Sequence, residues 1–313
     1  MSVDSHLRGA DIHSRVVVAR DPGLRGSGSS IDEVRLQALL DRTVVNLFAT
    51  LGRGAGTLPA NSVVAWQRIA RPGQRVGIKV NTLGGRAMST SVAVVDAICE
   101  RLLQAGTKPV DIVIFDRQTW ELERVGFSIA EGGNRIQCYG SDRAGYQNAV
   151  STWGSVSNRL SNILLRCDVL INVPILKDHE LAGVTLALKN MYGVISNPNQ
   201  CHANGCDPSI ADLNMLPEIR QRLRVTIGDA TTAVYEGGPS RPGHTWPCNA
   251  LLASQDPVAI DFTGWQMIER QRAEKGLPTL ATVGRPANFL KTAADDRHRL
   301  GYCDPERIVL VKA

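Results

Sequence analysis

The chain has 313 residues, of which 43% are hydrophobic and 21% are charged, an ordinary globular composition with enough apolar material for a sizeable core. The net charge of +5 comes from interspersed basic and acidic residues without a run of Lys or Arg, which argues against nucleic-acid binding. No apolar run approaches the roughly 20 residues of a spanning helix, and residues 1–8 show neither a secretion signal nor a twin arginine. We therefore expect a cytoplasmic protein without membrane contact.

The first half of the chain alternates predicted strands and helices. In chain order we predict a strand over 15–20, a capped helix from 30 to 48, a strand over 76–81, a helix from 92 to 106, a strand over 111–116, a short helix through 122 and a weaker strand over 135–139. A strand, a helix and a strand at this spacing form a βαβ unit, whose strands run parallel. The polar stretch 141–157 is the predicted boundary between two lobes, 1–150 and 151–313.

The second half is organised around one apolar run, 169–176, which ends in Lys177, Asp178 and His179. The other predicted elements are a helix ending at 166, a helical segment over 210–223 that Pro217 must interrupt, a strand over 224–229, a short strand over 251–253, a helix opening at Asp256-Pro257 and a strand over 308–311. The whole pattern predicts an α/β fold with a largely parallel, doubly wound sheet, arranged in two lobes with a cleft between them.

Polar or ionisable groups follow several of the predicted strands. Ligands of open parallel sheets bind beyond the carboxyl ends of the strands, so these groups are expected to form one pocket for a small-molecule substrate. The candidate substrate-binding residues are Lys79, Asn81, Arg86, Asp116, Asp229 and Glu236. Lys79 lies within an apolar strand, so its amine points either to a buried anionic partner or to a solvated edge.

A candidate catalytic set follows the central apolar run and consists of Lys177, His179, Lys189 and Asn190. A loop and a helix start between His179 and Lys189 can turn both side chains toward one pocket. A desolvated lysine has a lowered pKa and can act as a nucleophile or base. A histidine that titrates near neutrality can be a general base or a metal ligand. The plainer alternatives are a solvated helix lysine and a histidine that hydrogen-bonds at a strand end.

The segment 201–207, Cys-His-Ala-Asn-Gly-Cys-Asp, brings three kinds of metal ligand close together. His202, Cys206 and Asp207 are therefore candidate ligands for a divalent nickel, zinc or iron ion. The alternative is a turn at Asn204-Gly205 with buried cysteines. Seven cysteines at irregular spacing argue against a disulfide framework. No Walker loop or dinucleotide fingerprint is present, so neither ATP nor NAD is implied.

Several of these segments together resemble the domain-of-unknown-function-362 family. They are Val-Gly-Ile-Lys-Val-Asn at 76–81, the Ser-Thr helix start at 89–90, the run 172–190 with Lys177, His179, Gly183 and Lys189-Asn190, His-Ala-Asn-Gly-Cys-Asp-Pro at 202–208, and Asp-Pro-Val-Ala at 256–259. The resemblance covers nearly the whole chain from residue 76 on. Some family members also carry ferredoxin segments. This chain has no Cys-x-x-Cys run, so an iron–sulfur cluster of that type is not implied.

A more distant resemblance is to the lactate racemase family, which uses a nickel-pincer nucleotide. His179, Ala182-Gly183 and Lys189 match the spacing of a histidine, an Ala-Gly pair and a lysine in that family. The resemblance implies that Lys189 anchors a cofactor and that histidines, with His202 near the second position, serve catalysis and metal ligation. The sequence departs from the family at 116–118 and at 186–188, where the family has Gly-Thr-His and Ser-Gly-Gly.

These observations predict an enzyme, of the isomerase or oxidoreductase type, that acts on a small polar or anionic organic molecule. Lysine and histidine would carry proton-transfer or redox chemistry, with or without a divalent metal. Two alternatives stay open: a non-catalytic metal or cofactor carrier, and an iron–sulfur redox protein built from scattered cysteines. The pattern is compatible with a homo-oligomer. The substrate, the metal and the oligomeric state do not follow from the sequence.

Overall fold

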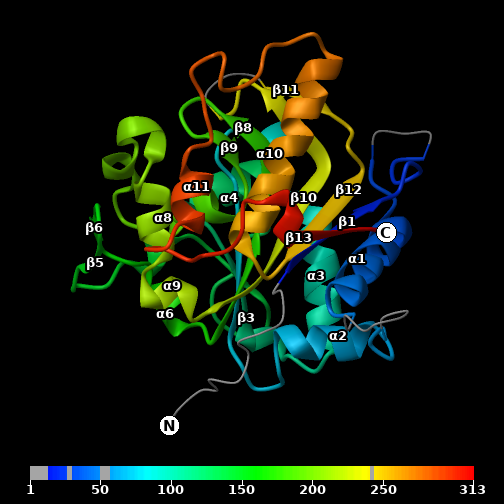
Figure 1. The fold of residues 1–313 in the computed structure, drawn as a ribbon. Helices are drawn as coiled ribbons and strands as arrows, with labels where there is room; N and C mark the ends of the chain where they lie inside the picture. Colours follow the sequence, from blue (N-terminus) through cyan, green and yellow to red (C-terminus); the bar gives the residue numbers. More distant parts are fainter. Residues whose placement is uncertain (1–12, 27–29, 50–56, 240–242) are drawn as a thin grey trace, which may run out of the picture.

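The computed structural model describes residues 13–26, 30–49, 57–239 and 243–313. Residues 1–8, on which the expectation of a cytoplasmic protein depends, lie outside these ranges. Parts of the predicted loops at 21–29 and 235–248 lie outside them as well. The centre of the molecule is a mixed, mostly parallel sheet of 11 strands, whose main path runs in the order β13-β1-β12-β10-β7-β2-β3-β4. Figure 1 shows this sheet passing through the middle of the molecule with helices on both sides.

The strands of the sheet come from nearly the whole described chain. They are β1 (Ser14–Arg20), β2 (Val76–Val80), β3 (Ile112–Phe115), β4 (Gln137–Cys138), β7 (Val169–Val173), β8 (Ile175–His179), β9 (Gly183–Thr185), β10 (Leu223–Glu236), β11 (His244–Trp246), β12 (Ala250–Ser254) and β13 (Ile308–Lys312). Strand β2 pairs in parallel with β3 and β7, and β7 pairs in parallel with β10. Strand β12 runs antiparallel to β1 and β10, which makes the sheet mixed.

Helices cover both faces of the sheet. One face carries α1 (Glu33–Leu47), α2 (Ser62–Ile69), α3 (Val92–Gln104) and α4 (Thr119–Val125). The other carries α5 (Ser141–Ala144), α6 (Asn162–Arg166), α7 (Ala187–Asn190), α8 (Ser209–Asn214), α9 (Pro217–Arg220), α10 (Pro257–Glu274) and α11 (Phe289–Ala294). A hairpin of β5 (Ser151–Trp153) and β6 (Val156–Asn158) stands apart from the sheet. The predicted α/β fold with both faces covered is thus observed.

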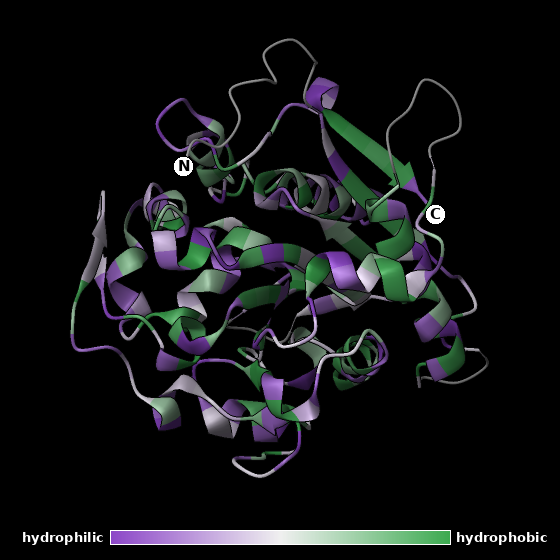
Figure 2. Ribbon diagram, turned by 90° about the horizontal axis from the view of Figure 1, so that it is seen from below, coloured by the Kyte–Doolittle hydropathy of each residue, from purple (hydrophilic) through white to green (hydrophobic). Residues whose placement is uncertain are grey.

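The burial pattern of the strands explains their near-continuous apolar sequences. Successive side chains of a strand point to opposite faces of the sheet. In β1, Val16 and Val18 belong to the core under α10, whereas Val17 and Ala19 belong to the core under α1. A strand that is buried on both faces must be apolar at every position rather than at alternate ones. Figure 2 shows hydrophobic residues gathered on the central strands and mixed character along the surrounding helices.

Several predicted boundaries need correction. The sheet takes adjacent strands, β2 and β7, from the two predicted halves, and the division into lobes at 1–150 and 151–313 stays a prediction. The N-cap of α1 is Asp32, whose carboxylate accepts the Arg35 N–H, instead of Ser30. Pro174 divides the central apolar run into β7 and β8. Strand β10 continues to Glu236 and has 14 residues, well beyond the predicted end at 229.

Two other predictions at proline positions agree with the structure. Pro217 starts α9 and so divides the predicted helical segment in two. Asp256 is the N-cap of α10, and its carboxylate accepts the N–H groups of Val258 and Ala259. Within the described residues, no helix is long and apolar enough to cross a membrane.

Candidate functional site

A cavity of about 260 Å³, here named the lysine cavity, lies beyond the carboxyl ends of β2, β3 and β8. Eight of the candidate residues line it, namely Lys79, Asn81, Asp116, Lys177, His179, Lys189, Asn190 and His202. Parallel strands end at the same edge of a sheet, and this explains why residues far apart in the sequence meet here.

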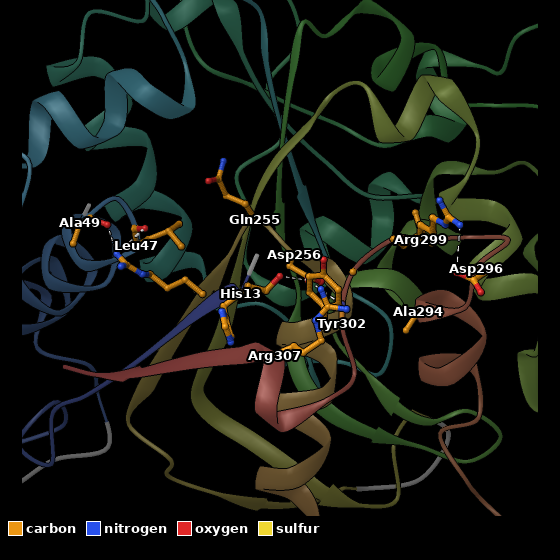
Figure 3. Close-up of a pocket in the computed structure, with 14 residues that line it drawn as sticks. His13, Leu47, Ala49, Gln255, Asp256, Ala294, Asp296, Arg299, Tyr302 and Arg307 are labelled. Atoms are coloured by element: carbon orange, nitrogen blue, oxygen red, sulfur yellow. Dashed lines mark hydrogen bonds and ion pairs between the residues drawn. The ribbon is translucent and has the colours of Figure 1, made fainter. Parts of the chain in front are cut away.

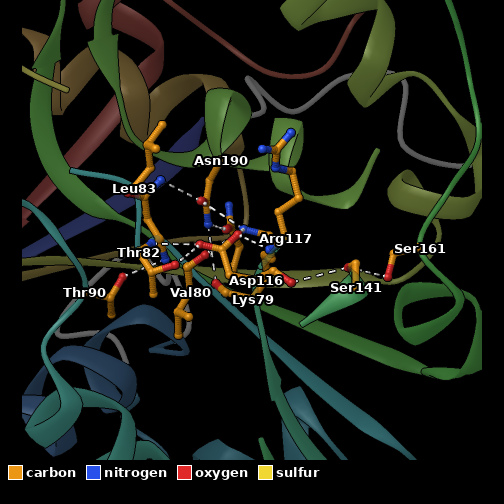
Figure 4. A network of polar contacts seen from close by, with 12 residues as sticks. Lys79, Val80, Thr82, Leu83, Thr90, Asp116, Arg117, Ser141, Ser161 and Asn190 are labelled. Atoms are coloured by element: carbon orange, nitrogen blue, oxygen red, sulfur yellow. Dashed lines mark hydrogen bonds and ion pairs between the residues drawn. The ribbon is translucent and has the colours of Figure 1, made fainter. Parts of the chain in front are cut away.

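The floor of the cavity is a buried ion pair (Figure 4). Lys79 Nζ donates to Asp116 Oδ1 at 2.7 Å and to the Val80 carbonyl oxygen at 2.6 Å. Asp116 Oδ2 accepts the Thr82 N–H and hydroxyl at 2.7 and 2.8 Å. A Cβ on Gly193 would lie 2.5 Å from Lys79 Nζ, so a glycine is required where the chain covers the pair. Lys79 therefore has the buried anionic partner, and the two charges neutralise each other.

A second buried network joins the floor to the helical turn that carries Lys189. Asn190 Oδ1 accepts Asn81 Nδ2 at 3.1 Å, and Asn190 Nδ2 donates to Asn172 Oδ1 at 2.8 Å. Asn190 is 2% exposed. Its amide is thus used to hold neighbouring chain segments together.

We expect Asn190→Leu to lower the free energy of unfolding by about 1–3 kcal/mol, because the buried Asn172 oxygen loses its amide donor. Urea denaturation measures this, with Asn134→Leu at an exposed position as the control. If the Asn190 variant is as stable as the Asn134 variant, the network does not hold the turn.

Lys177 is held by protein acceptors on all sides. Its Nζ donates to Asn81 Oδ1 at 2.7 Å and to the carbonyl oxygens of Leu83 and Met88 at 2.7 and 3.0 Å. These three neutral acceptors match the three N–H donors of an ammonium group. Burial lowers the pKa of Lys177 to about 7. The predicted catalytic amine is thus engaged in fixing loop 82–91 against β8.

His179 has a fixed tautomer. Its Nδ1 accepts the backbone N–H groups of Leu181 and Ala182 at 3.1 and 3.2 Å. A backbone N–H can only donate, so Nδ1 is unprotonated and the neutral ring carries its proton on Nε2. Burial, followed by the nearby charge of Lys189, lowers the pKa of His179 to about 2. In this position the neutral ring is therefore favoured, which differs from a histidine that titrates near neutrality.

Lys189 presents a buried amine to the same cavity. Its Nζ lies 3.3 Å from His202 Nε2 and 3.6 Å from the centre of the Tyr192 ring. No carboxylate of the described residues lies within ion-pair distance of it. Burial lowers the pKa of Lys189 to about 8. The helical turn that carries Lys189 is held by α10, because the Asp261 carboxylate accepts the N–H groups of Ala187 and Leu188.

The three candidate metal ligands do not form a ligand set. Within the described ranges, no three His, Cys, Asp or Glu side chains are grouped so that they could hold a metal ion. His202 contacts Lys189 instead, while Cys206 is fully buried and burial raises the pKa of its thiol. Asp207 Oδ1 is buried, and the described residues offer it no hydrogen bond.

The residues present do not fit the nickel cofactor that the racemase resemblance implies, nor an iron–sulfur centre built from scattered cysteines. Ligation through His179 Nε2 would require the proton on Nδ1, where two backbone N–H groups already donate. A cluster requires several grouped thiolates, and the cysteines show no such group in the described part of the chain.

Three candidate substrate-binding residues lie outside the lysine cavity. Arg86 and Asp229 line a separate cavity of about 520 Å³. There Arg86 Nε donates to the Val125 carbonyl oxygen, and Asp229 accepts the Ser91 N–H. Glu236 pairs with Arg272 and Arg285. Strand β10 passes the cavity edge and continues for seven residues beyond Asp229, so these carboxylates lie away from the other strand ends.

A larger cavity of about 720 Å³ holds none of the candidate residues (Figure 3). Its polar groups already serve the fold. Asp256 caps α10 and also accepts the Ser14 hydroxyl and the Tyr302 N–H, while Arg15 donates to carbonyl oxygens at the end of α1. The size of this cavity therefore carries no functional meaning by itself.

Several residues of the lysine cavity were not predicted from the sequence. They include Glu121, Glu180, Thr185, Tyr192 and Asn199. Tyr192 is three positions after Lys189, a spacing at which side chains share one face of a helical turn, and this signal was available. Glu121 comes from the short helix α4, Thr185 from the three-residue strand β9, and Glu180 and Asn199 from the connections that follow β8 and α7. None of these segments is long enough to show a period in the sequence.

Comparison with known proteins supplies the family. The family model described as "Domain of unknown function (DUF362)" matches residues 76–266, more than half of the chain. The chain belongs to the DUF362 family. The match spans every strand and helix that lines the lysine cavity, from β2 to the turn carrying His202.

One relative of this family member is the "Thylakoid-associated protein sll1697" of Synechocystis sp. It is 28% identical over 227 residues, which are 69% of this chain and 68% of the relative. Among solved structures, the lactate racemase apoprotein from Thermoanaerobacterium thermosaccharolyticum is similar with a TM-score of 0.42 and 14% identity, over 80% of this chain and 58% of that one. A protein from Thermotoga maritima gives 0.40 and 11%, over 79% and 60%. The chain thus spans about three fifths of the length of each solved protein, and the likeness is a partial one.

Proposed function

We propose that this protein is an enzyme that transfers a proton on a small anionic organic molecule, with Lys189 as the acid–base group. The state of the Lys189 amine carries this proposal. The amine lines a cavity at the strand ends, is buried, and has no carboxylate partner among the described residues. Burial lowers its pKa to about 8, and a group with a pKa near the working pH is the most effective acid–base catalyst.

The cavity is lined by four basic side chains, Lys79, Arg117, Lys177 and Lys189, and by three carboxylates, Asp116, Glu121 and Glu180. The contacts of the lysines favour an anionic ligand. Lys79 and Asp116 neutralise each other, whereas Lys177 donates to neutral acceptors and Lys189 faces an imidazole and a phenol ring. A buried positive charge without a counter-ion is costly, and an anionic ligand would supply the missing partner. The volume of about 260 Å³ lies below the roughly 300–1,000 Å³ of sites for drug-sized ligands, which favours a small molecule.

Exchange of carbon-bound hydrogen with solvent tests this function. Small 2-hydroxy, 2-amino and 2-oxo acids are incubated with the protein in D₂O, and proton NMR follows the replacement of C–H by C–D. We expect exchange of at least one class at a rate that rises through about pH 8, as Lys189 loses its proton. The Lys189→Met variant should be slower by a factor of about 10²–10⁴.

Lys275→Met, which removes an exposed amine, is the matched control and should exchange like the unaltered protein. Equal rates in the Lys189 and Lys275 variants would contradict the assignment of the base. Absence of exchange with all three classes of acid would contradict the proposed reaction.

A further inference from the structure

The ring nitrogen Nε2 of His179 has no role in the proton transfer proposed above. One ring nitrogen, Nδ1, is occupied by the N–H groups of Leu181 and Ala182. The other, Nε2, carries the proton of the neutral ring, and the described residues offer it no acceptor. The ring lines the lysine cavity together with Lys189. Within the described part of the chain, the ring thus presents an N–H donor without a protein acceptor at the wall of the cavity.

The surroundings keep this ring neutral. A proton on Nδ1 would meet two backbone donors and would break both hydrogen bonds. Lys189, His202, Lys177 and Arg285 act on His179, and all four disfavour a positive charge on its ring, while the carboxylate of Glu180 lines the same cavity. The ring is also 5% exposed, so water does not stabilise an imidazolium. Across the physiological pH range, His179 is a donor and not a base.

From this geometry we infer that His179 is a catalytic hydrogen-bond donor to an oxygen on which negative charge develops. The inference rests on the proposed function of Lys189 and narrows its substrate to one class: a carbon acid whose reacting C–H is next to a carbonyl or carboxylate group. A neutral N–H donor suits such an oxygen because it stabilises the developing charge without giving up its own proton.

The proton balance of the step is complete with these two residues. The neutral amine of Lys189 takes the proton from the carbon next to the carbonyl group, and the C–H bond breaks. Its electron pair forms a carbon–carbon double bond, while the carbonyl π electrons move to oxygen and give an enolate. That oxygen accepts the hydrogen bond of His179 Nε2–H. Return of the proton from the Lys189 ammonium to carbon regenerates both groups, so no oxidant or reductant is needed.

Two substitutions at position 179 test the roles of the two ring nitrogens one at a time. His179→Asn keeps a short acceptor for the Leu181 and Ala182 N–H groups and removes the donor that faces the cavity. His179→Gln reaches further, so it returns an N–H donor to the cavity and gives up the acceptor at the turn. Oxalate is the probe, because it is a small planar dianion that resembles the enolate of a carboxylic acid.

We expect nitrogen-15 NMR of the histidine rings to show His179 with its proton on Nε2 from pH 5 to pH 9, and to show that signal shifting when oxalate is added. Calorimetric titration should give oxalate affinity about tenfold to hundredfold lower in the Asn variant, the value for loss of a hydrogen bond to a charged group. The Gln variant should recover most of this loss.

Thermal unfolding tests the other nitrogen. The Asn variant, which keeps the acceptor for the Leu181 and Ala182 N–H groups, should be more stable than the Gln variant.

Three results would overturn the inference: a proton on Nδ1, no binding of oxalate, or equal oxalate affinity in the Asn variant and the unaltered protein. The exchange assay distinguishes this failure from that of the proposed function. If exchange is lost in Lys189→Met but kept in His179→Asn, Lys189 remains the base and His179 is not the donor. If oxalate binds as expected but Lys189→Met exchanges normally, the donor stands and the assignment of the base fails.

Discussion

Lys189→Met is expected to raise the free energy of unfolding by about 3 kcal/mol at pH 7. Burial lowers the pKa of Lys189 from 10.5 to about 8, and each pKa unit corresponds to about 1.4 kcal/mol. Below pH 8 the amine is charged in both the folded and the unfolded chain, so the folded protein bears the full cost of the buried charge. Methionine fills similar space without that charge. Residues that serve a reaction often reduce stability in this way.

The sign of the pH dependence gives an independent check. Between pH 8 and pH 10.5 the unfolded chain binds more protons at Lys189 than the folded chain does, so the unaltered protein gains stability as the pH rises. The difference from Lys189→Met should therefore shrink over this interval. Urea denaturation at several pH values measures it, with Lys275→Met as the surface control. A constant difference from pH 7 to pH 10 would show that the pKa is not lowered.

Lys79→Met is expected to have the opposite effect and to lower the free energy of unfolding by about 3–5 kcal/mol. The substitution removes the cation from a buried ion pair and leaves the Asp116 carboxylate without a counter-charge. This loss is a large fraction of the 5–15 kcal/mol that stabilise a typical domain. Circular dichroism and urea denaturation at 25 °C follow the change.

The double variant Lys79→Met with Asp116→Asn provides the matched control. It removes both charges, and neutral replacement of a buried pair costs far less than loss of one partner. We expect it to recover most of the stability, even if the single variant fails to fold. A double variant that is no more stable than Lys79→Met would mean that the pair matters for packing and not for charge.

The sequence indicated much of the site because strand ends can be recognised locally. Asp116 and Lys177 each follow an apolar run and Lys79 lies one residue before the end of another, and parallel strands bring such ends to one edge. The same rule expects Asp229 at this edge, but Asp229 lines another cavity, and Glu236, predicted in the loop after that strand, also lies outside the lysine cavity. Strand β10 does not end at Asp229, because it goes on to pair with β8 and β11. A strand's length depends on its partners, and the sequence does not name them.

The hydrogen-bond partners and protonation states of the cavity residues could not be predicted from neighbouring residues in the sequence. A buried lysine requires a partner, but only the fold shows that Lys79 has a carboxylate and Lys177 has neutral oxygens. Lys189, on helix α7, has neither among the residues that the structure describes. The protonation state of His179 depends on two backbone N–H groups of the following turn, which no spacing rule predicts.

The sequence by itself determined the α/β class and the approximate positions of most strands. It also indicated that Lys189 and His179 line one cavity. These features follow from the period and the composition of short segments, which are properties of neighbouring residues. The tertiary structure alone decided that one sheet takes strands from both halves of the described chain and that Lys177 donates to three neutral oxygens. It also decided that, among the residues the structure describes, His202, Cys206 and Asp207 do not form a ligand set. Such features depend on which distant atoms meet, and so on packing and hydrogen bonding that become fixed when the chain is folded.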